Sequence, residues 1–282
     1  MTLPRVLSDV RSLRIPAMRL GTWGCVAALL FLVFTALALF PYQLAPFDPQ
    51  ARVGPTFSPP STLHLFGTDE IGRDLASRTI LALRYTWLPA LALIAFSLFV
   101  GLAIGVAAGF VGGWFDFAVQ RLVDLFMTLP SMLVALAIAA TLGPGTVNTL
   151  IAIALTWWPW YAVIARDETR RLKARPHFEA AQVARIGWWR LIWHYLAPGV
   201  YPALVAAAAL DVANVVSALA LMSFLGLGQP DPAPELGSMI SRSMDSLTAF
   251  WWLPIIPGLV IFALCITANV LGDAVRASLR GR

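Results

Sequence analysis

Six stretches of mostly apolar residues follow one another along the chain, with polar segments between them. A transmembrane helix needs about 20 mostly apolar residues to cross the hydrocarbon core of a bilayer. The six stretches reach this length, so we predict six transmembrane helices in an all-α integral membrane protein. The predicted spans are residues 21–41, 86–111, 117–142, 146–165, 199–222 and 251–271. The first stretch exceeds the roughly 7–15 apolar residues of a signal peptide, which favours a retained helix over a cleaved leader.

Composition supports a membrane protein. Of the 282 residues, 59% are hydrophobic and 12% are charged, whereas an ordinary soluble domain carries about 25% charged residues. A soluble helical protein with so apolar a surface would aggregate. The net charge of +5 is not gathered into the basic patch that nucleic-acid binding requires, so we expect no nucleic-acid partner.

The basic residues predict the orientation, because Lys and Arg are enriched in cytoplasmic loops. With the N-terminus inside, fifteen of the 20 basic residues fall on the inner side and five on the outer side. We therefore predict that both termini are cytoplasmic. Residues 1–20 are expected to form a cytoplasmic N-terminal segment, and residues 21–282 a single transmembrane domain.

Two predicted outer segments are more elaborate than turns. Residues 42–85 are rich in proline, and Thr68 followed by Asp69 and Glu70 has the pattern of a helix start. Residues 226–250 begin with a proline-rich loop, and a short amphipathic helix is expected from Pro234 onward. Each segment is equally compatible with a surface for a periplasmic partner and with a simple connecting loop.

Three glycines in the second span recur every four residues: Gly101, Gly105 and Gly109. This spacing places them on one face of a helix, where the backbone of another helix can approach closely. The spacing predicts tight helix packing, and it does not indicate a pore.

The largest cytoplasmic loop, residues 166–198, contains the stretch HFEAAQVARIGWWRLIWHYLAP (177–198). Small and apolar residues recur there at helical spacing, namely Ala180, Val183, Ala184, Gly187 and Leu191. The aromatic residues that follow suit a membrane interface. We predict a helix along the membrane surface. The residues alone leave two interpretations open: a knob that docks on a cytoplasmic protein, or a surface helix without a partner.

Glu179-Ala180-Ala181, followed by Ile192 and Pro198, resembles the "EAA" loop of bacterial ABC importer permeases. Other segments resemble the dipeptide/oligopeptide/nickel permease family and extend over nearly the whole chain. They are FGTDEIGRD (66–74), GFVGGWFD (109–116), RLVDLFMTLPS (121–131), LGPG (142–145), SFLGLG (223–228), IPG (256–258) and LGDAVRASL (271–279). The chain departs from the family pattern at three positions: Arg185 replaces a usual glycine, Ala197 a usual leucine and Leu219 a frequent glutamate.

The resemblance implies the type I ABC importer permease fold in the bacterial inner membrane, with the EAA segment as a cytoplasmic coupling helix. It implies three kinds of partner: a homologous second permease, two ATP-binding-cassette ATPases, and a periplasmic or lipid-anchored substrate-binding protein. The ATPase-coupling residues would be Glu179, Ala180, Ala181, Arg185 and Gly187. ATP and Mg²⁺ would be used by the ATPases, so no cofactor is expected in this chain. Di- and oligopeptides are the expected substrates, and nickel or another small solute is the alternative.

The residues themselves argue against an enzyme. The only lysine, Lys173, has no glycines near it, so the chain has no P-loop. His177 and His194 share the cytoplasmic loop but lack a third ligand, and we expect no metal site. An intramembrane protease or lipid transferase would need paired polar residues deep within separate spans. Asp211 stands nearly alone at that depth, which argues against both enzymes.

Asp211, Asn214 and Ser217 are polar residues inside the fifth predicted span, spaced by three. Polar groups within a membrane are costly and mark functional positions. We predict that the three share one helix face and line the translocation path or the contact with a partner permease. A helix–helix hydrogen bond without a transport role is the alternative. A secondary transporter is the remaining alternative function, and six spans with a cytoplasmic coupling loop fit it poorly.

Overall fold

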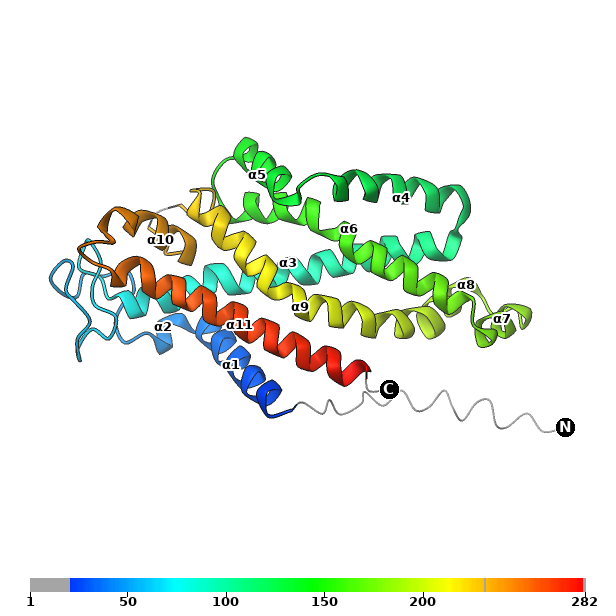
Figure 1. Ribbon diagram of the computed structural model, residues 1–282, viewed down its shortest axis with the longest axis horizontal. Helices are drawn as coiled ribbons and strands as arrows, with labels where there is room; N and C mark the ends of the chain where they lie inside the picture. Colours follow the sequence, from blue (N-terminus) through cyan, green and yellow to red (C-terminus); the bar gives the residue numbers. More distant parts are fainter. Residues whose placement is uncertain (1–20, 231, 281–282) are drawn as a thin grey trace.

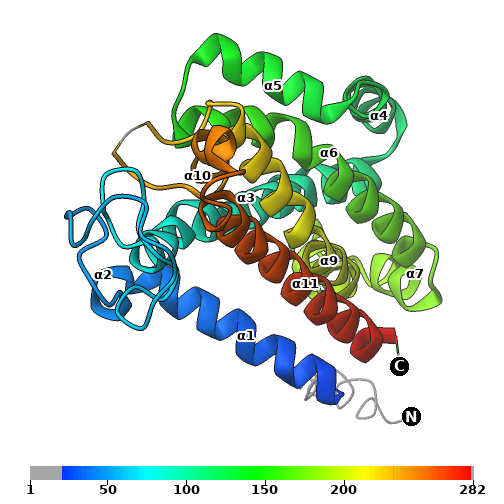
Figure 2. The same ribbon diagram turned by 60° about the vertical axis from the view of Figure 1, so that its left-hand side comes forward.

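The computed structural model describes residues 21–230 and 232–280, and every regular element within them is a helix (Figure 1). Four long helices make most of the body: α3 (Leu75–Val111), α6 (Thr146–Lys173), α9 (Ala197–Phe224) and α11 (Trp252–Arg280). α1 (Thr22–Leu39) packs against α3 and α11. α4 (Gly113–Thr128) and α5 (Ser131–Leu142) lie on the opposite side of the bundle from α1 (Figure 2).

Five helices are long and apolar enough to cross a membrane, and the bent pair of α4 and α5 supplies a sixth if it counts as one span. Three helices extend well beyond the apolar stretches that predicted them. α3 has 37 residues, which corresponds to about 56 Å of helix against a hydrocarbon core of about 30 Å. Hydropathy underestimated the length of these helices, because their ends continue beyond the apolar stretches into polar surroundings. The predicted segment 1–20 lies outside the described residues.

The predicted span over 117–142 does not form one continuous helix. The chain bends by 86° between α4 and α5, and Leu129 is extended, with φ −87° and ψ 142°. The cause is local. Pro130 has no amide hydrogen to donate, and its ring disfavours the helical conformation of the residue before it.

The predicted helix start at Thr68 was also wrong, because tertiary contacts use Thr68 elsewhere. Its hydroxyl donates to the carbonyl of Pro55 at 2.6 Å, and its backbone pairs with Asp74 in an isolated bridge. The helix begins six residues later. Asp74 caps α3, since its carboxylate accepts from the amide of Ser77 at 2.8 Å.

The predicted close packing at the glycine stripe is confirmed between α3 and α6. A Cβ atom at Gly101 would collide with Tyr161, and one at Gly105 with the carbonyl of Ala162. At Gly109 the nearest atom would be the carbonyl oxygen of Arg166, at 2.8 Å. The backbones of α3 and α6 therefore lie in close contact from Gly101 to Gly109.

The two outer segments pack together as a cap at one end of the bundle. The rings of Phe57 and Phe250 stack with centroids 4.2 Å apart, beside the buried side chain of Trp252. The expected helix after Pro234 is α10 (Leu236–Ser243). Just before it, the Glu235 carboxylate accepts from the amide of Gln229 and the hydroxyl of Ser223, and burial raises its pKa. The cap also includes α2 (Pro41–Leu44) and the 3₁₀ turn Met244–Ser246.

Candidate functional site

The segment expected to couple to ATPases projects from the other end of the bundle, beyond the ends of α6 and α9 (Figure 1). It consists of α7 (Pro176–Val183), a turn, α8 (Trp188–Leu191) and a π-helix (Ile192–Leu196) that leads directly into α9. Its attachment to the bundle is apolar. Phe178 is 1% exposed and Leu196 is fully buried, and both belong to the main hydrophobic core.

The five predicted coupling residues do not share one environment. Glu179, Ala180, Arg185 and Gly187 are exposed, whereas Ala181 is 5% exposed and packs into the core. Ala181 therefore holds α7 on the bundle and presents no docking surface. Beside the exposed residues lies Val183, which is 85% exposed. Val183 and the four exposed residues therefore form the outer side of this segment.

The prediction of one continuous helix through Leu191 was wrong. The chain leaves the helix after Val183, and the amide of Ile186 reaches back to the carbonyl of Ala181 at 3.2 Å. Arg185 sits in the left-handed region, with φ +53°. This is the position where the family pattern has glycine, the residue that adopts positive φ without steric cost. The glycine that the chain does have, Gly187, adopts an ordinary φ of −58°.

Replacing Arg185 with glycine is expected to stabilise this turn. A residue with a Cβ atom pays roughly 1–2 kcal/mol in the left-handed region, and the added freedom of glycine in the unfolded chain offsets part of that. We expect a net gain of about 0.5–1 kcal/mol, measured as a higher thermal midpoint of the purified protein. Arg185→Ala is the control, because it removes the charge but keeps the strain. An equal gain in both variants would assign the effect to the charge.

Three exposed tryptophans follow the turn: Trp188, Trp189 and Trp193. Successive rings meet edge to face, with centroids 5.5 and 5.6 Å apart. They come immediately before the apolar helix α9. Indole rings favour the boundary between headgroups and hydrocarbon, so this position fits the predicted membrane interface.

An ion pair and a lysine–carbonyl hydrogen bond join the helix ends next to this segment. Arg166 of α6 donates two hydrogen bonds to the carboxylate of Asp116 on α4, of 2.5 and 2.8 Å, and both side chains are largely buried. Lys173, at the end of α6, donates to the carbonyl of Phe110 at 2.7 Å and lies over the Phe110 ring. The ends of α3, α4 and α6 are thereby held together where the coupling segment begins.

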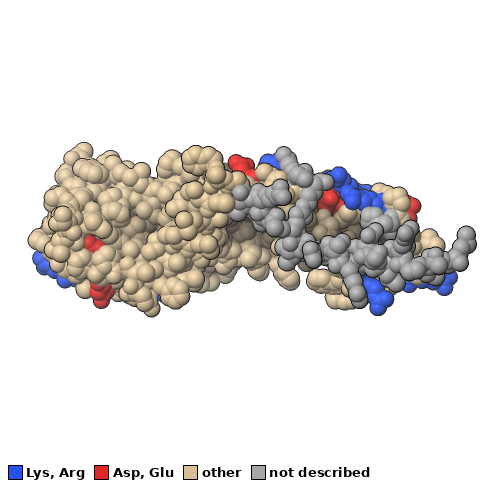
Figure 3. Space-filling model, turned by 90° about the horizontal axis from the view of Figure 1, so that it is seen from below, with Lys and Arg blue, Asp and Glu red and all other residues tan. Residues whose placement is uncertain are grey.

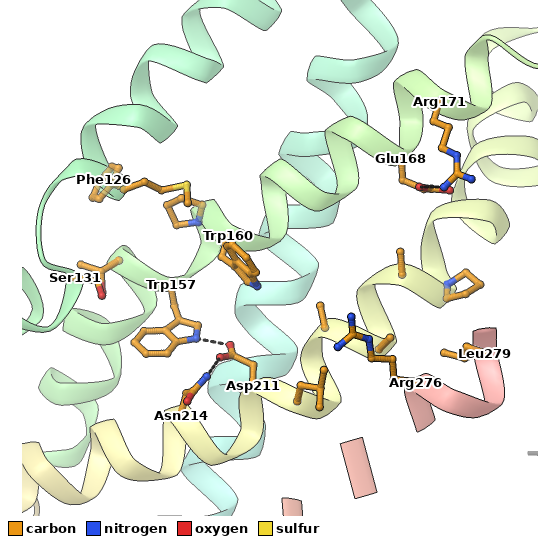
Figure 4. Close-up of a pocket in the computed structure, with 18 of the residues that line it drawn as sticks. Phe126, Ser131, Trp157, Trp160, Glu168, Arg171, Asp211, Asn214, Arg276 and Leu279 are labelled. Atoms are coloured by element: carbon orange, nitrogen blue, oxygen red, sulfur yellow. Dashed lines mark hydrogen bonds and ion pairs between the residues drawn. The ribbon is translucent and has the colours of Figure 1, made fainter. Parts of the chain in front are cut away.

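A cleft of about 950 Å³ opens among α4, α5, α6, α9 and α11 (Figure 4). Its wall on α9 is made largely of small residues, among them Gly199, Ala203, Ala206 and Ala207. Tryptophans from α6 and side chains from the α4–α5 bend line the facing side. The bend that hydropathy missed therefore shapes one wall of the cleft.

Asp211 is the buried polar centre of the cleft. Its Oδ2 accepts from the indole of Trp157 at 2.5 Å and from the hydroxyl of Tyr161 at 2.9 Å. Its Oδ1 accepts from the side-chain amide of Asn214 at 3.1 Å. Figure 4 shows Trp157 and Asn214 converging on this carboxylate. The structure thus brings Asp211 and Asn214 together and adds two α6 donors.

Ser217 does not lie with them. Its hydroxyl is 3.5 Å from the sulfur of Cys265 on α11, and it is not among the residues that line the cleft. The geometry of a helix explains this. Each residue turns the helix by about 100°, so residues six apart point about 120° away from each other. Residues three apart therefore share a helix face, but residues six apart do not.

Trp157 and Tyr161 were missed by sequence analysis. They lie four residues apart on α6 and therefore on one face. Both carry a hydrogen-bond donor on an aromatic ring, which needs a partner when buried. This pattern was a usable signal, although only the fold shows that the partner is Asp211.

The two histidines of residues 166–198 lie in different elements of the structure. His194 lies in the π-helix that precedes α9, and His177 lies in α7. Among the side chains that the structure describes, which do not include that of His177, no group of three or more His, Cys, Asp or Glu is placed to hold a metal ion. The remaining histidine, His64, is bonded to Asp74 in the cap, with Nδ1 and Oδ1 2.9 Å apart.

These helices define an all-helical, multi-pass membrane protein with a cleft between its spans. Residues 101–281 match the family described as binding-protein-dependent transport system inner membrane component, and the chain belongs to this family. It is accordingly a permease subunit of an ABC importer in the inner membrane, a transporter rather than a catalytic enzyme. The resemblance to the dipeptide/oligopeptide/nickel permeases is thereby confirmed.

Two relatives cover nearly the whole chain. The di/tripeptide transport system permease protein DppC of Pseudomonas aeruginosa is 36% identical, over 91% of this chain and 87% of the relative. The nickel transport system permease protein NikC of Escherichia coli is 37% identical, over 90% and 92%. A chain of the inward-facing MetNI methionine ABC transporter aligns at 18% identity and a TM-score of 0.49, covering 69% of this chain and 96% of that one.

Proposed function

We propose that this permease pairs with a homologous second permease and that the two together enclose the path for di- and oligopeptides. The cleft among α4, α5, α6, α9 and α11 would be this chain's half of the path. Its size supports the proposal, because about 950 Å³ lies at the upper end of the roughly 300–1,000 Å³ of small-molecule sites. The di/tripeptide relative supports the substrate class.

In this proposal α7 is the EAA coupling helix, and Glu179, Ala180, Arg185 and Gly187 contact a cytoplasmic ATPase. The observation that carries the proposal is the position of α7: a short helix at the end of the bundle, with an apolar inner side and an exposed outer side. Two ATPase subunits would use ATP and Mg²⁺. Their closure would move the coupling helices and switch the paired bundles between outward and inward access.

The topology belongs to the same proposal. α4 and α5 together would form one broken span, giving six spans with both termini in the cytoplasm. Most of the visible Lys and Arg side chains lie toward the end of the molecule that carries α7 and α8 (Figure 3), which is the distribution expected of the cytoplasmic end. The cap at the opposite end would then receive a periplasmic or lipid-anchored binding protein.

Nickel uptake is the second candidate function. The NikC relative, as similar to the chain as the peptide permease, favours it. Both candidates use the same machinery and differ only in the cargo.

Purification from the native membrane tests the proposal. The affinity-tagged chain, extracted in mild detergent, is expected to bring down one homologous permease and two ATPases. Proteoliposomes holding that complex are expected to accumulate substrate only with ATP and the binding protein. A chain that purifies alone, or uptake that does not require ATP, would overturn the proposal.

A further inference from the structure

Among the described residues, no Lys, Arg or His side chain forms an ion pair with the Asp211 carboxylate. Its three hydrogen bonds come from an indole, a phenol and an amide, all of them neutral donors. Arg276 of α11 lines the same cleft (Figure 4), but no ion pair joins it to Asp211. Glu168, the other carboxylate that lines the cleft, is paired with Arg171 at 3.5 Å. The inner wall of the cleft therefore carries one acidic group, Asp211, that takes part in no ion pair.

This group sits at the centre of a membrane-spanning helix. α9 has 28 residues, and Asp211 lies about 20 Å from either end. An unpaired carboxylate at that depth is expensive, and such residues mark the routes of ions and substrates. Packing does not require the charge, because an amide of the same shape would also accept from Trp157 and Tyr161.

The surroundings of Asp211 fit an ammonium group. A carboxylate oxygen has about two acceptor sites, and Oδ1 receives one hydrogen bond, from Asn214. The exposed indole of Trp160 lines the same cleft, and aromatic faces attract cations. A bare metal ion fits less well, because indole, phenol and amide nitrogen are poor ligands and only one carboxylate is present.

We propose that Asp211 binds the free ammonium group of a substrate as it passes through the cleft, so that this permease favours cargo with an unblocked amino terminus. The inference rests on the proposed function, since it requires the cleft to be part of the path. It adds the chemical group that the path recognises and the residue that recognises it.

The test is uptake of alanyl-alanine by the complete transporter in proteoliposomes, with the loaded binding protein in excess. Asp211→Asn keeps the shape and removes the charge, and we expect uptake to fall about tenfold or more. The swap Asp211→Asn with Asn214→Asp returns a carboxylate one helical turn away, and we expect it to recover part of the loss. Asp124→Asn makes the same chemical change at an exposed residue that does not line the cleft, and it is expected to leave uptake unchanged.

Assembly with the partner subunits and basal ATPase activity are measured for every variant. Normal uptake by Asp211→Asn would overturn the inference, as would equal losses in the single and swap variants when both assemble. If the single variant does not assemble, the swap variant is the test: uptake above a tenth of wild type supports the inference, and uptake at or below a tenth overturns it.

The wild-type transporter is also offered Ni²⁺ in place of the peptide. ATP-dependent uptake of Ni²⁺ without uptake of alanyl-alanine would overturn the ammonium subsite and leave the importer intact. Wild-type uptake of neither probe would remove the proposed substrates together with this inference.

Discussion

Glu179→Arg is expected to abolish copurification of the ATPases while the second permease remains bound. Glu179 is an exposed acid in the first turn of α7, on the part of the chain that we propose docks on an ATPase. A reversed charge at the centre of a protein interface leaves its partner groups unpaired, and such hot-spot changes cost about 2–4 kcal/mol. The yield of ATPase per permease should fall at least about tenfold, measured by quantitative gel or mass spectrometry.

Asp245→Arg is the matched control for this experiment. Asp245 is exposed in the 3₁₀ turn of the cap, at the opposite end of the bundle, and the substitution makes the same change of charge. ATPase copurification should be unaffected. Loss of the second permease together with the ATPases in Glu179→Arg would point to a misfolded chain. Unchanged ATPase yield would remove α7 as the docking element.

The spans were predictable from sequence because bilayer length imposes a simple rule on apolar stretches. α1 and α9 match their predicted stretches within a few residues. The bend between α4 and α5 was also readable, since Leu129-Pro130 interrupts the hydrogen-bond pattern of any helix. Reliance on hydropathy alone concealed it, because the residues on both sides of the proline are apolar.

The cap and the coupling segment depended on contacts that a single sequence does not reveal. Thr68 has the local pattern of a helix cap, yet its hydroxyl is bonded to Pro55, thirteen residues earlier. Ala180 to Leu191 has helical spacing, yet the chain turns at Arg185. For Asp211, the cost of a buried carboxylate predicted a special position, but its donors on α6 were not identifiable without the fold.

Arg166→Met is expected to destabilise the permease strongly. Asp116 and Arg166 form a two-bond ion pair in which the side chains are 10% and 15% exposed. Arg166→Met leaves the Asp116 carboxylate with only the exposed Arg170, at 3.7 Å, and loss of one partner from a buried pair costs about 3–5 kcal/mol. The thermal midpoint in detergent should fall by roughly 6–10 °C. Because the pair ties α4 to α6 beside the coupling segment, ATPase stimulation by loaded binding protein should fall as well.

Two further variants separate this effect from a general loss of charge. Removing both partners, with Asp116→Leu added to Arg166→Met, leaves no buried charge and should recover much of the lost stability. Arg121→Met breaks the pair between Arg121 and Asp124 on α4, whose side chains are 65% and 51% exposed, and exposed pairs contribute at most about 1 kcal/mol. If the double variant were no more stable than Arg166→Met alone, the damage would come from lost packing of the arginine stem against α4. The charges that lose a partner in the double variant, Arg170 and Asp167, are 58% and 63% exposed, so no buried charge would remain unpaired.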